Sequence, residues 1–265
     1  MRRSLYTILI LLCVTLQACF EYNPNQIILE DDEKDLTAKN IAKLQETTPS
    51  ETIRFVFMGD TQRFYDESDD FVKSVNQLAN IDFVVHGGDI SDFGLVQEFK
   101  WIHEIMSGLK VPYLTVIGNH DLLANGRKVY REMYGELDYT FEYGNYRFIM
   151  LNTNSREFNF NGTVPDLMWL KQQLEDNTAN KKTVVMSHIP PFDGDFDPNL
   201  EQEYAQLLAE DPNVELSLHA HRHSFFDNEY YDDGTRYFVT TSMQKRGYIV
   251  VTMSSQETQI EVINY

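Results

Sequence analysis

Short blocks of hydrophobic residues alternate along this chain with stretches of helical spacing. Blocks rich in β-branched and aromatic residues predict strands at residues 53–58, 81–86, 113–117, 146–151, 183–187 and 214–218. Between these strands, the apolar spacing predicts helices near residues 69–79, 96–108, 126–134, 165–177 and 199–210. This alternation is typical of an α/β domain. After residue 223 the pattern predicts three consecutive strands, 236–241, 247–253 and 258–263, that close a second sheet.

Composition and charge narrow the possible functions. The chain has 265 residues, of which 42% are hydrophobic, enough for a sizeable core. Its 41 acidic and 22 basic residues give a formal net charge of −19, which repels polyanions, so nucleic acid is not an expected partner. Two cysteines exclude a disulfide scaffold and a multi-cysteine zinc module.

The first residues predict an export signal and a tether. Met1-Arg2-Arg3 is followed by an apolar run at residues 5–16 that is too short for a comfortable membrane span. The run ends in Leu16-Gln17-Ala18-Cys19, which resembles the lipobox of bacterial lipoproteins and implies a lipidated Cys19 in the cell envelope. An ordinary cleaved signal or an uncleaved anchor is the alternative. We therefore expect a signal peptide at 1–18, an acidic solvated tether at 19–51 with a short helix around 36–44, and one domain at 52–265.

Polar residues suited to metal binding follow five of the predicted strands, where open α/β sheets place their ligands. The motifs are Gly59-Asp60-Thr61-Gln62, Gly88-Asp89-Ile90-Ser91-Asp92, Gly118-Asn119-His120-Asp121, His188, and His219-Ala220-His221-Arg222-His223. Carboxylate, amide and imidazole ligands together suit manganese, iron or zinc better than calcium or copper. Taken singly, the Asp and Asn residues could merely cap helices, but five motifs in this order indicate a site.

In this order the motifs resemble the calcineurin-like metallophosphoesterase superfamily, whose pattern runs D-x-H, G-D, G-N-H-[DE], H and G-H-x-H. The resemblance covers residues 53–224 and implies a four-layer α/β/β/α sandwich of two mixed sheets flanked by helices. It also implies two divalent metal ions, manganese, iron or zinc, bridged by Asp89. One ion would be held by Asp60, Gln62 and His223, and the other by Asn119, His188 and His221. A hydroxide bridging the two ions would attack phosphorus in line.

The same resemblance implies a role for His120 as the general acid that protonates the leaving group. Asp92 matches the second Asp of the D-x-x-D spacing that orients this histidine in the phosphoprotein phosphatase branch. That branch has Arg at the next position, where this chain has Phe93. The layout is more similar to the cyclic-nucleotide phosphodiesterase and purple-acid-phosphatase-like branches. The expected substrate is a small phosphate monoester or diester, which Arg63, Arg127 and Arg222 could contact.

Two residues depart from the family pattern. Gln62 replaces the His expected after the first Asp, and Ala220 replaces the Gly of G-H-x-H. A neutral amide oxygen is a weaker ligand than imidazole, so the alternative to an enzyme is an exported surface binding protein with an impaired metal site. Four other residues are not expected to bind metal: His86 (packing, or support of a metal ligand), His103 (part of a helix), Asp121 (orienting or capping) and His219 (strand residue with a satisfied hydrogen bond).

Overall fold

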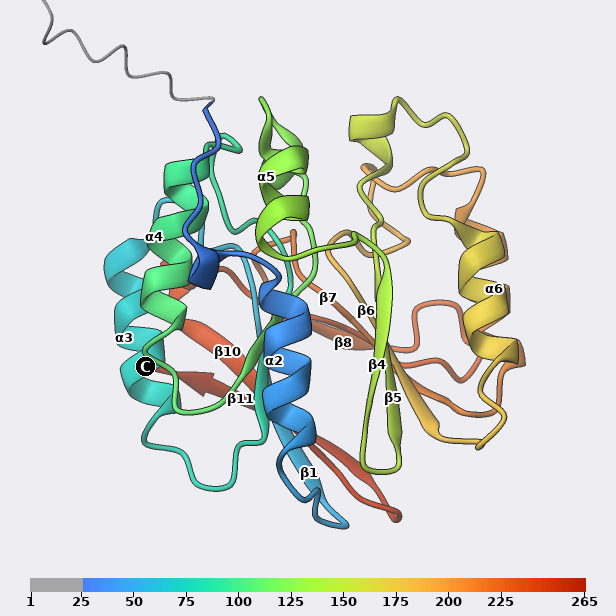
Figure 1. The fold of residues 1–265 in the computed structure, drawn as a ribbon. Helices are drawn as coiled ribbons and strands as arrows, with labels where there is room; N and C mark the ends of the chain where they lie inside the picture. The colour runs from blue at the N-terminus through green and yellow to red at the C-terminus, as the bar shows by residue number, and fades with distance from the viewer. Residues whose placement is uncertain (1–25) are drawn as a thin grey trace, which may run out of the picture.

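Two β-sheets pack face to face, with helices on both outer sides, in the computed structural model, which describes residues 26–265 (Figure 1). The first sheet has the order β11 (Thr258–Asn264), β10 (Gly247–Met253), β1 (Ile53–Met58), β2 (Phe83–His86), β3 (Tyr113–Thr115). The second has the order β4 (Tyr139–Tyr143), β5 (Tyr146–Leu151), β6 (Lys182–Ser187), β7 (Val214–His219), β9 (Tyr237–Val239), β8 (Phe226–Asn228). Both sheets contain parallel and antiparallel pairs.

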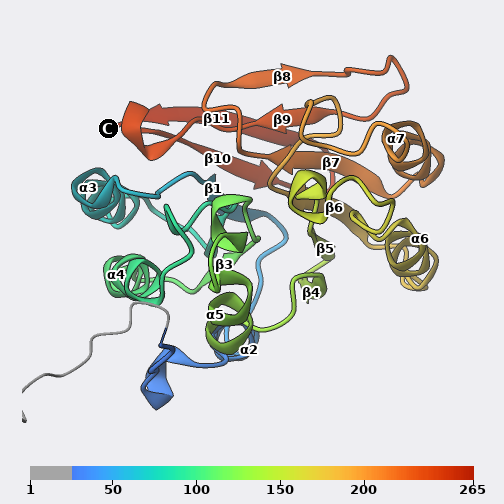
Figure 2. The ribbon, with the colours of Figure 1, turned by 90° about the horizontal axis from the view of Figure 1, so that it is seen from above.

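Helices cover the two outer faces, as the view from above shows (Figure 2). On the first sheet lie α3 (Tyr65–Val75), α4 (Val96–Met106) and α5 (Gly126–Met133), and on the second lie α6 (Leu167–Glu175) and α7 (Glu201–Glu210). The layer between the sheets is aromatic: the Phe55 and Phe83 rings stack with centroids 5.0 Å apart, and Phe148 meets both edge-on. The predicted four-layer α/β/β/α sandwich is confirmed.

The strand directions bring the polar motifs together. Strands β1, β2 and β3 are parallel to one another, and so are β5, β6, β7 and β9. A bridge between Gly59, just past β1, and Ser242, just past β9, links the two sheets at this edge. The segments that follow β1, β2, β3, β6 and β7 therefore meet at one end of the sandwich.

The prediction that the last three strands close the second sheet is wrong. Only β9 belongs to the second sheet, where it pairs with β7. The chain then turns through a 3-10 helix at Met243–Lys245, and β10 pairs antiparallel with β1 in the first sheet. Almost every residue of β10 is buried, because that strand lies between β1 and β11 with the inter-sheet core on one face and helices on the other.

Part of residues 19–51, which the sequence predicts to be a solvated tether with a short helix, packs on the domain. Helix α2 (Leu36–Gln45) buries Leu36, Asn40 and Leu44, which lie four residues apart on one face. The Asn40 side chain donates a hydrogen bond of 2.8 Å to the carbonyl of Tyr113 in β3. The signal peptide and Cys19 lie outside the described residues. Between residues 26 and 265, no helix is long and apolar enough to cross a membrane.

Candidate metal centre

Six of the seven predicted metal ligands gather at the edge where the parallel strands end, and the seventh, Gln62, reaches the same group through Asp89. Five have positive φ angles: Asp60 (57°), Gln62 (33°), Asp89 (59°), His221 (69°) and His223 (53°). Residues other than Gly rarely adopt this left-handed backbone conformation. It costs about 1–3 kcal/mol per residue when a fold imposes it. The surrounding structure therefore holds the backbone of these loops in a strained shape that turns the side chains inward.

Asp89 lies at the middle of the group and is almost completely buried. Its Oδ1 accepts a hydrogen bond of 2.9 Å from the backbone N–H of His120 and lies 3.4 Å from Nε2 of His188. Its Oδ2 accepts a hydrogen bond of 2.9 Å from the amide of Gln62. A Cβ at position 118 would collide with the backbone nitrogen and Oδ1 of Asp89, which is why Gly118 stands there. Both carboxylate oxygens thus face groups that come from different strands.

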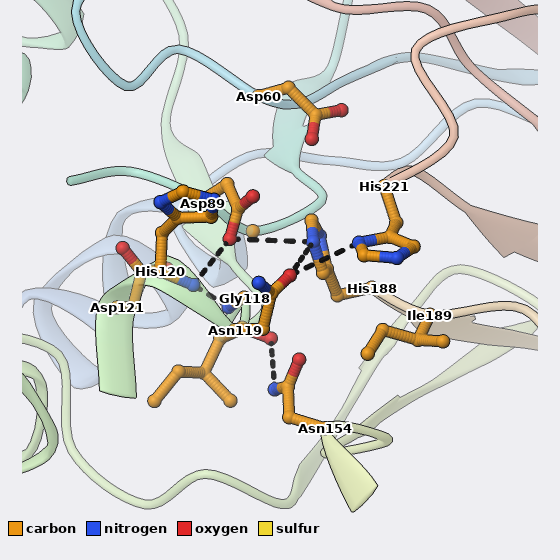
Figure 3. A network of polar contacts seen from close by, with 12 residues as sticks. Asp60, Asp89, Gly118, Asn119, His120, Asp121, Asn154, His188, Ile189 and His221 are labelled. Carbon is orange, nitrogen blue, oxygen red and sulfur yellow. Dashed lines mark hydrogen bonds and ion pairs between the residues drawn. The ribbon is translucent and has the colours of Figure 1, made fainter. Parts of the chain in front are cut away.

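Asn119 joins the two histidines of the second sheet. Its Oδ1 lies 3.1 Å from Nε2 of His188 and 3.1 Å from Nδ1 of His221 (Figure 3). One ligand atom from each of Asp89, His188 and His221 lies within 4.8 Å of the others, a spacing that a single cation could bridge. The structure therefore brings together the residues predicted for one metal ion.

Asp60 is the clearest sign that a cation belongs here. Its carboxylate is completely buried, and neither oxygen accepts a hydrogen bond from any residue between 26 and 265. Nε2 of His223 lies 3.2 Å from Asp60 Oδ1, so a protonated His223 can form an ion pair with it. A buried carboxylate without hydrogen bonds is costly unless a cation compensates its charge. The Asp60 backbone N–H donates to the carbonyl of Gly88, the residue before Asp89, at 3.0 Å, and no dashed line joins the Asp60 carboxylate to the residues drawn in Figure 3.

The contacts of His188 and His221 turn one ring nitrogen of each toward the other predicted ligands. His188 Nδ1 lies 2.8 Å from the carbonyl of Gly87, which can only accept, so Nδ1 carries the hydrogen and Nε2 is left as the ligand atom. His221 turns Nδ1 toward Asn119, and its Nε2 lies 3.7 Å from Asp193 and 3.5 Å from Asp195. A carboxylate behind a metal-binding histidine fixes its orientation and raises its basicity.

Asp193 and Asp195 are the functional candidates that the sequence analysis missed. They lie in the loop between β6 and α7, and the nearby imidazole of His221 lowers the pKa of Asp193. Arg156 forms an ion pair with Asp195. The Asp-Gly-Asp sequence at 193–195 is the only local sequence feature that could have pointed to these residues, but Asp and Gly are also common in simple turns.

The ionisation of Asp89 and His188 shows how strongly the site favours positive charge. Burial alone lowers the pKa of His188, but the carboxylates of Asp89 and Asp60 outweigh it and raise the pKa to about 10. Burial likewise raises the pKa of Asp89, and His188 opposes this and holds that pKa well below its ordinary range. A proton on His188 thus supplies part of the charge that a metal ion would bring.

The two departures from the family pattern have different structural consequences. Ala220 has no positive φ angle, and its methyl group fills the space between Gly59 and Gly87, so this replacement is accommodated by packing. Gln62 is 5% exposed and uses its NH₂ group to hold Asp89, which leaves its carbonyl oxygen as the atom that could bind a metal.

His120 and Asp92 lie beside the metal ligands, but they are connected differently from the expected carboxylate–histidine pair. His120 Nδ1 lies 2.8 Å from the backbone carbonyl of Asp92 and 3.7 Å from its carboxylate. That carboxylate accepts a hydrogen bond of 2.7 Å from Arg63. Asp92 therefore orients His120 mainly through its backbone. The imidazole is about one-third exposed and accessible to a substrate.

The other residues near the motifs have structural contacts. Asp121 accepts hydrogen bonds from Ser91 and from the backbone of Gly118, and burial raises its pKa to about 6. His219 is completely buried between the hydroxyls of Ser187 and Ser217, so the prediction of a satisfied strand residue is confirmed. The remaining contacts are His86 with Thr61, His103 with Tyr113, Arg127 over the Phe158 ring, and Arg222 beside Asp193.

The comparisons with known proteins agree with this geometry. The family model of the calcineurin-like phosphoesterases matches residues 53–225, so the chain belongs to that family. Its fold is similar to that of a dimetal phosphatase from Danio rerio, with a TM-score of 0.66 at 12% identity over 79% of this chain and 95% of the other. It is also similar to the purple acid phosphatase PPD1 from yellow lupin, with a TM-score of 0.65 at 14% identity over 82% of this chain and 52% of the other.

The curated relatives are matched over only part of their own length. The protein YvnB of Bacillus subtilis is 25% identical over 81% of this chain and 20% of its own length. A protein of Arcobacter nitrofigilis named "Probable glycerophosphodiester phosphodiesterase GpdQ" is 30% identical over 42% of each chain. The chain thus spans less than half the length of these two relatives. Members of the family bind divalent metal ions, and the residues described above have the donor types that such ions require.

Proposed function

We propose that this protein is a metal-dependent hydrolase of small phosphate esters. The observation that carries the proposal is the buried carboxylate of Asp60, which accepts no hydrogen bond from the described residues and whose charge, with that of Asp89, raises the pKa of His188. A fold that buries this much negative charge needs a cation of matching charge. The family, whose relatives include proteins named as phosphodiesterases, supports an ester of phosphate as the substrate.

Two divalent ions, manganese, iron or zinc, fit the two halves of the group. Asp60, the carbonyl oxygen of Gln62 and His223 would hold one ion, and Asn119, His188 and His221 the other, with Asp89 shared between them. A shared carboxylate reduces the repulsion between neighbouring dications. When bound, such ions supply positive charge to the phosphoryl oxygens and make a water molecule nucleophilic at neutral pH.

The chain itself supplies the proton for the leaving group. Because the carbonyl of Asp92 can only accept, His120 Nδ1 carries a hydrogen, and Nε2 is the atom that exchanges a proton with the substrate. The water oxygen forms a bond to phosphorus, the bond from phosphorus to the ester oxygen breaks, and the proton from Nε2 goes to the departing oxygen. The proton released from the water passes to solvent. Such proton transfer contributes about 10²–10⁴ in rate.

A phosphoester panel with metal analysis tests this function. The full chain should hydrolyse p-nitrophenyl phosphate or bis(p-nitrophenyl) phosphate when manganese, iron(II) or zinc is added, and chelation should abolish the activity. Elemental analysis should find about two ions per chain. The matched variants are His188→Ala, which should lose metal, and His103→Ala, whose histidine lies on α4 away from the site and should retain it. No hydrolysis of either ester with any of these metals would contradict the proposal.

A binding protein with little turnover is the second candidate, and Gln62 favours it. Its amide donates to Asp89 and offers only a neutral oxygen where the family pattern has imidazole. This candidate predicts one ion or none per chain and no ester hydrolysis. It also predicts that Gln62→His raises the metal content and creates activity. An enzyme that uses Gln62 as a ligand, in contrast, already binds two ions and hydrolyses the ester before the substitution.

A further inference from the structure

The backbone carbonyl of His223 is held by two side chains of the turn between β9 and β10. The Thr241 hydroxyl donates to this carbonyl at 3.0 Å, and the Lys245 ammonium donates to it at 2.6 Å. A carbonyl oxygen has two lone pairs, and a hydrogen bond from a charged donor is roughly twice as strong as one between neutral groups. Residues 241–245, called the 241–245 turn below, therefore fix the backbone of a predicted metal ligand.

The same turn also holds the backbone of Asp60, the side chain that His223 faces. The N–H of Met243 donates to the carbonyl of Asp60 at 3.3 Å, and Ser242 forms a β-bridge with Gly59. Nε2 of His223 lies 3.2 Å from Oδ1 of Asp60. The 241–245 turn thus contacts the main chain on both sides of this pair, which is assigned above to one ion together with Gln62; that ion is called the first ion below.

His223 depends on such support because its own segment has no regular structure. Residues 220–225 lie between β7 and β8 and form neither helix nor strand. His223 has a φ angle of 53°, a left-handed conformation that residues other than Gly rarely adopt, and its side chain is 38% exposed. A strained backbone persists only when the surrounding structure imposes it. Without hydrogen bonds to its carbonyl, His223 can relax and move its imidazole away from Asp60.

The contacts of Lys245 single it out within the turn. Its side chain is exposed, and its ammonium forms no ion pair with a carboxylate of residues 26–265. The neighbouring Arg246, in contrast, pairs with Asp70 at 2.9 Å. Ordering a long exposed side chain costs conformational entropy, which a contact must offset. For Lys245 that contact is the charged hydrogen bond to the carbonyl of His223, so this hydrogen bond acts on the position of the imidazole.

We propose that Lys245 is a positioning residue for the first ion and holds His223 against Asp60 through its hydrogen bond to the His223 carbonyl. This inference rests on the proposed function, because it takes Asp60 and His223 as ligands of one ion. Partners that orient a metal ligand from behind commonly change metal affinity when they are replaced. Replacement of Lys245 should therefore weaken the binding of the first ion.

The second ion should depend little on Lys245. Its predicted ligands are Asn119, His188 and His221, and no hydrogen bond or ion pair joins any of them to the 241–245 turn within residues 26–265. A role of Lys245 in positioning His223 thus predicts an effect on one of two metal-binding steps, whereas a general role in folding predicts an effect on both.

Manganese titration of the metal-free full chain tests this assignment. Lys245→Met keeps most of the side-chain length and removes the hydrogen-bond donors. It should weaken one of the two dissociation constants by about tenfold or more and change the other by less than about threefold. Loss of a positive charge alone would strengthen the binding of a cation, so weaker binding reports the lost hydrogen bond.

Two further variants control this measurement. Lys245→Arg keeps a charged donor and should leave both constants within about threefold of those of the unmodified protein. Lys171→Met is the matched control for the change in net charge, because Lys171 is an exposed lysine on α6, and it should change neither constant.

Thermal unfolding without metal separates positioning from a general structural role. Metal-free Lys245→Met should unfold within about 3 °C of the unmodified protein, because an exposed side chain contributes little to overall stability. Unchanged dissociation constants in Lys245→Met, or equal weakening of both with a lower metal-free unfolding temperature, would overturn the positioning role while the hydrolase stands. Failure of the unmodified chain to bind two ions would overturn this inference and the proposed two-ion hydrolase together.

Discussion

The backbone carbonyl of Asp92 holds Nδ1 of His120 at 2.8 Å, while the Asp92 carboxylate lies 3.7 Å from the same nitrogen. A peptide carbonyl can only accept a hydrogen bond, so it fixes the position of the hydrogen on the ring as well as the ring's orientation. The orientation of His120 therefore depends on the shape of the 89–92 loop more than on the charge of Asp92.

His120→Ala should reduce turnover by about 10²–10⁴, because the departing oxygen loses its proton donor. The metal content should not change, because the backbone N–H of residue 120, which holds Asp89, is kept in the variant. Steady-state kinetics and elemental analysis of the same preparation check this prediction. A loss of metal in parallel with activity would show that the imidazole supports the metal ligands instead.

Asp92→Asn should lower kcat by less than about tenfold, because the carbonyl that orients His120 remains and one hydrogen bond to Arg63 is weakened. The measurement is kcat of this variant and of His120→Ala, both determined with one and the same phosphodiester substrate. An effect of Asp92→Asn as large as that of His120→Ala would mean that the carboxylate, despite its longer distance, is the group that matters.

Asp60→Asn keeps the volume of the side chain and removes its charge, so about one ion per chain should be lost. The stabilisation that manganese confers in thermal unfolding should fall by about 1–3 kcal/mol. The control is Asp197→Asn, whose carboxylate is also buried but accepts backbone hydrogen bonds from Gly162 and Asn199. Undiminished metal content in the Asp60 variant would exclude Asp60 as a ligand.

Leu44→Ala should destabilise the protein by about 2–5 kcal/mol, because Leu44 in α2 is only 1% exposed and lies in the core between the sheets. Ile28→Ala, at a position that is 58% exposed, serves as the matched control and should change stability little. Urea unfolding of both variants measures the difference. Equal, small effects would restore the interpretation of this segment as a solvated tether.

Asp138→Asn should remove a pH-dependent loss of stability. Burial raises the pKa of Asp138 to about 6, so the folded protein binds this proton more tightly than the unfolded chain does. The free energy of unfolding therefore falls as the pH rises from about 4 to about 6, by up to about 3 kcal/mol from this group. The Asn variant should match the unmodified protein near pH 4 and exceed its stability above pH 6. Unfolding series at pH 4, 5, 6 and 7 would show a constant difference if Asp138 were not responsible.

Local patterns predicted some elements exactly and others poorly. Strands β1, β5 and β10 begin and end where the sequence predicts, because each is a run in which all residues, or all but one, are buried. Helix α3 begins at Tyr65, four residues earlier than predicted, since polar residues in its first turns obscure the buried face formed by Phe71, Val72 and Val75. Strand β4 was missed, because an edge strand with only two buried residues gives a weak pattern.

Contacts between residues far apart in the sequence could not be predicted from local patterns. The pairing of Ile53 with Met253 assigns β10 to the first sheet, and nothing near either residue in the sequence specifies it. The metal-site residues could be predicted from the sequence, because each follows a recognisable strand and parallel strands bring such positions to one edge of the sheet. Asp193 and Asp195 have no such strand immediately before them, so only the folded loop reveals that they lie against His221.

The left-handed backbone at residues 60, 62, 89, 221 and 223 has a consequence for protein engineering. Grafting these amino acids onto the strand ends of another sandwich would not reproduce the centre, because ordinary turns would point the donor atoms elsewhere. The bends themselves would have to be copied, along with the small glycines that make room for them. To transfer this centre, the backbone torsion angles have to be reproduced before the identities of the side chains matter.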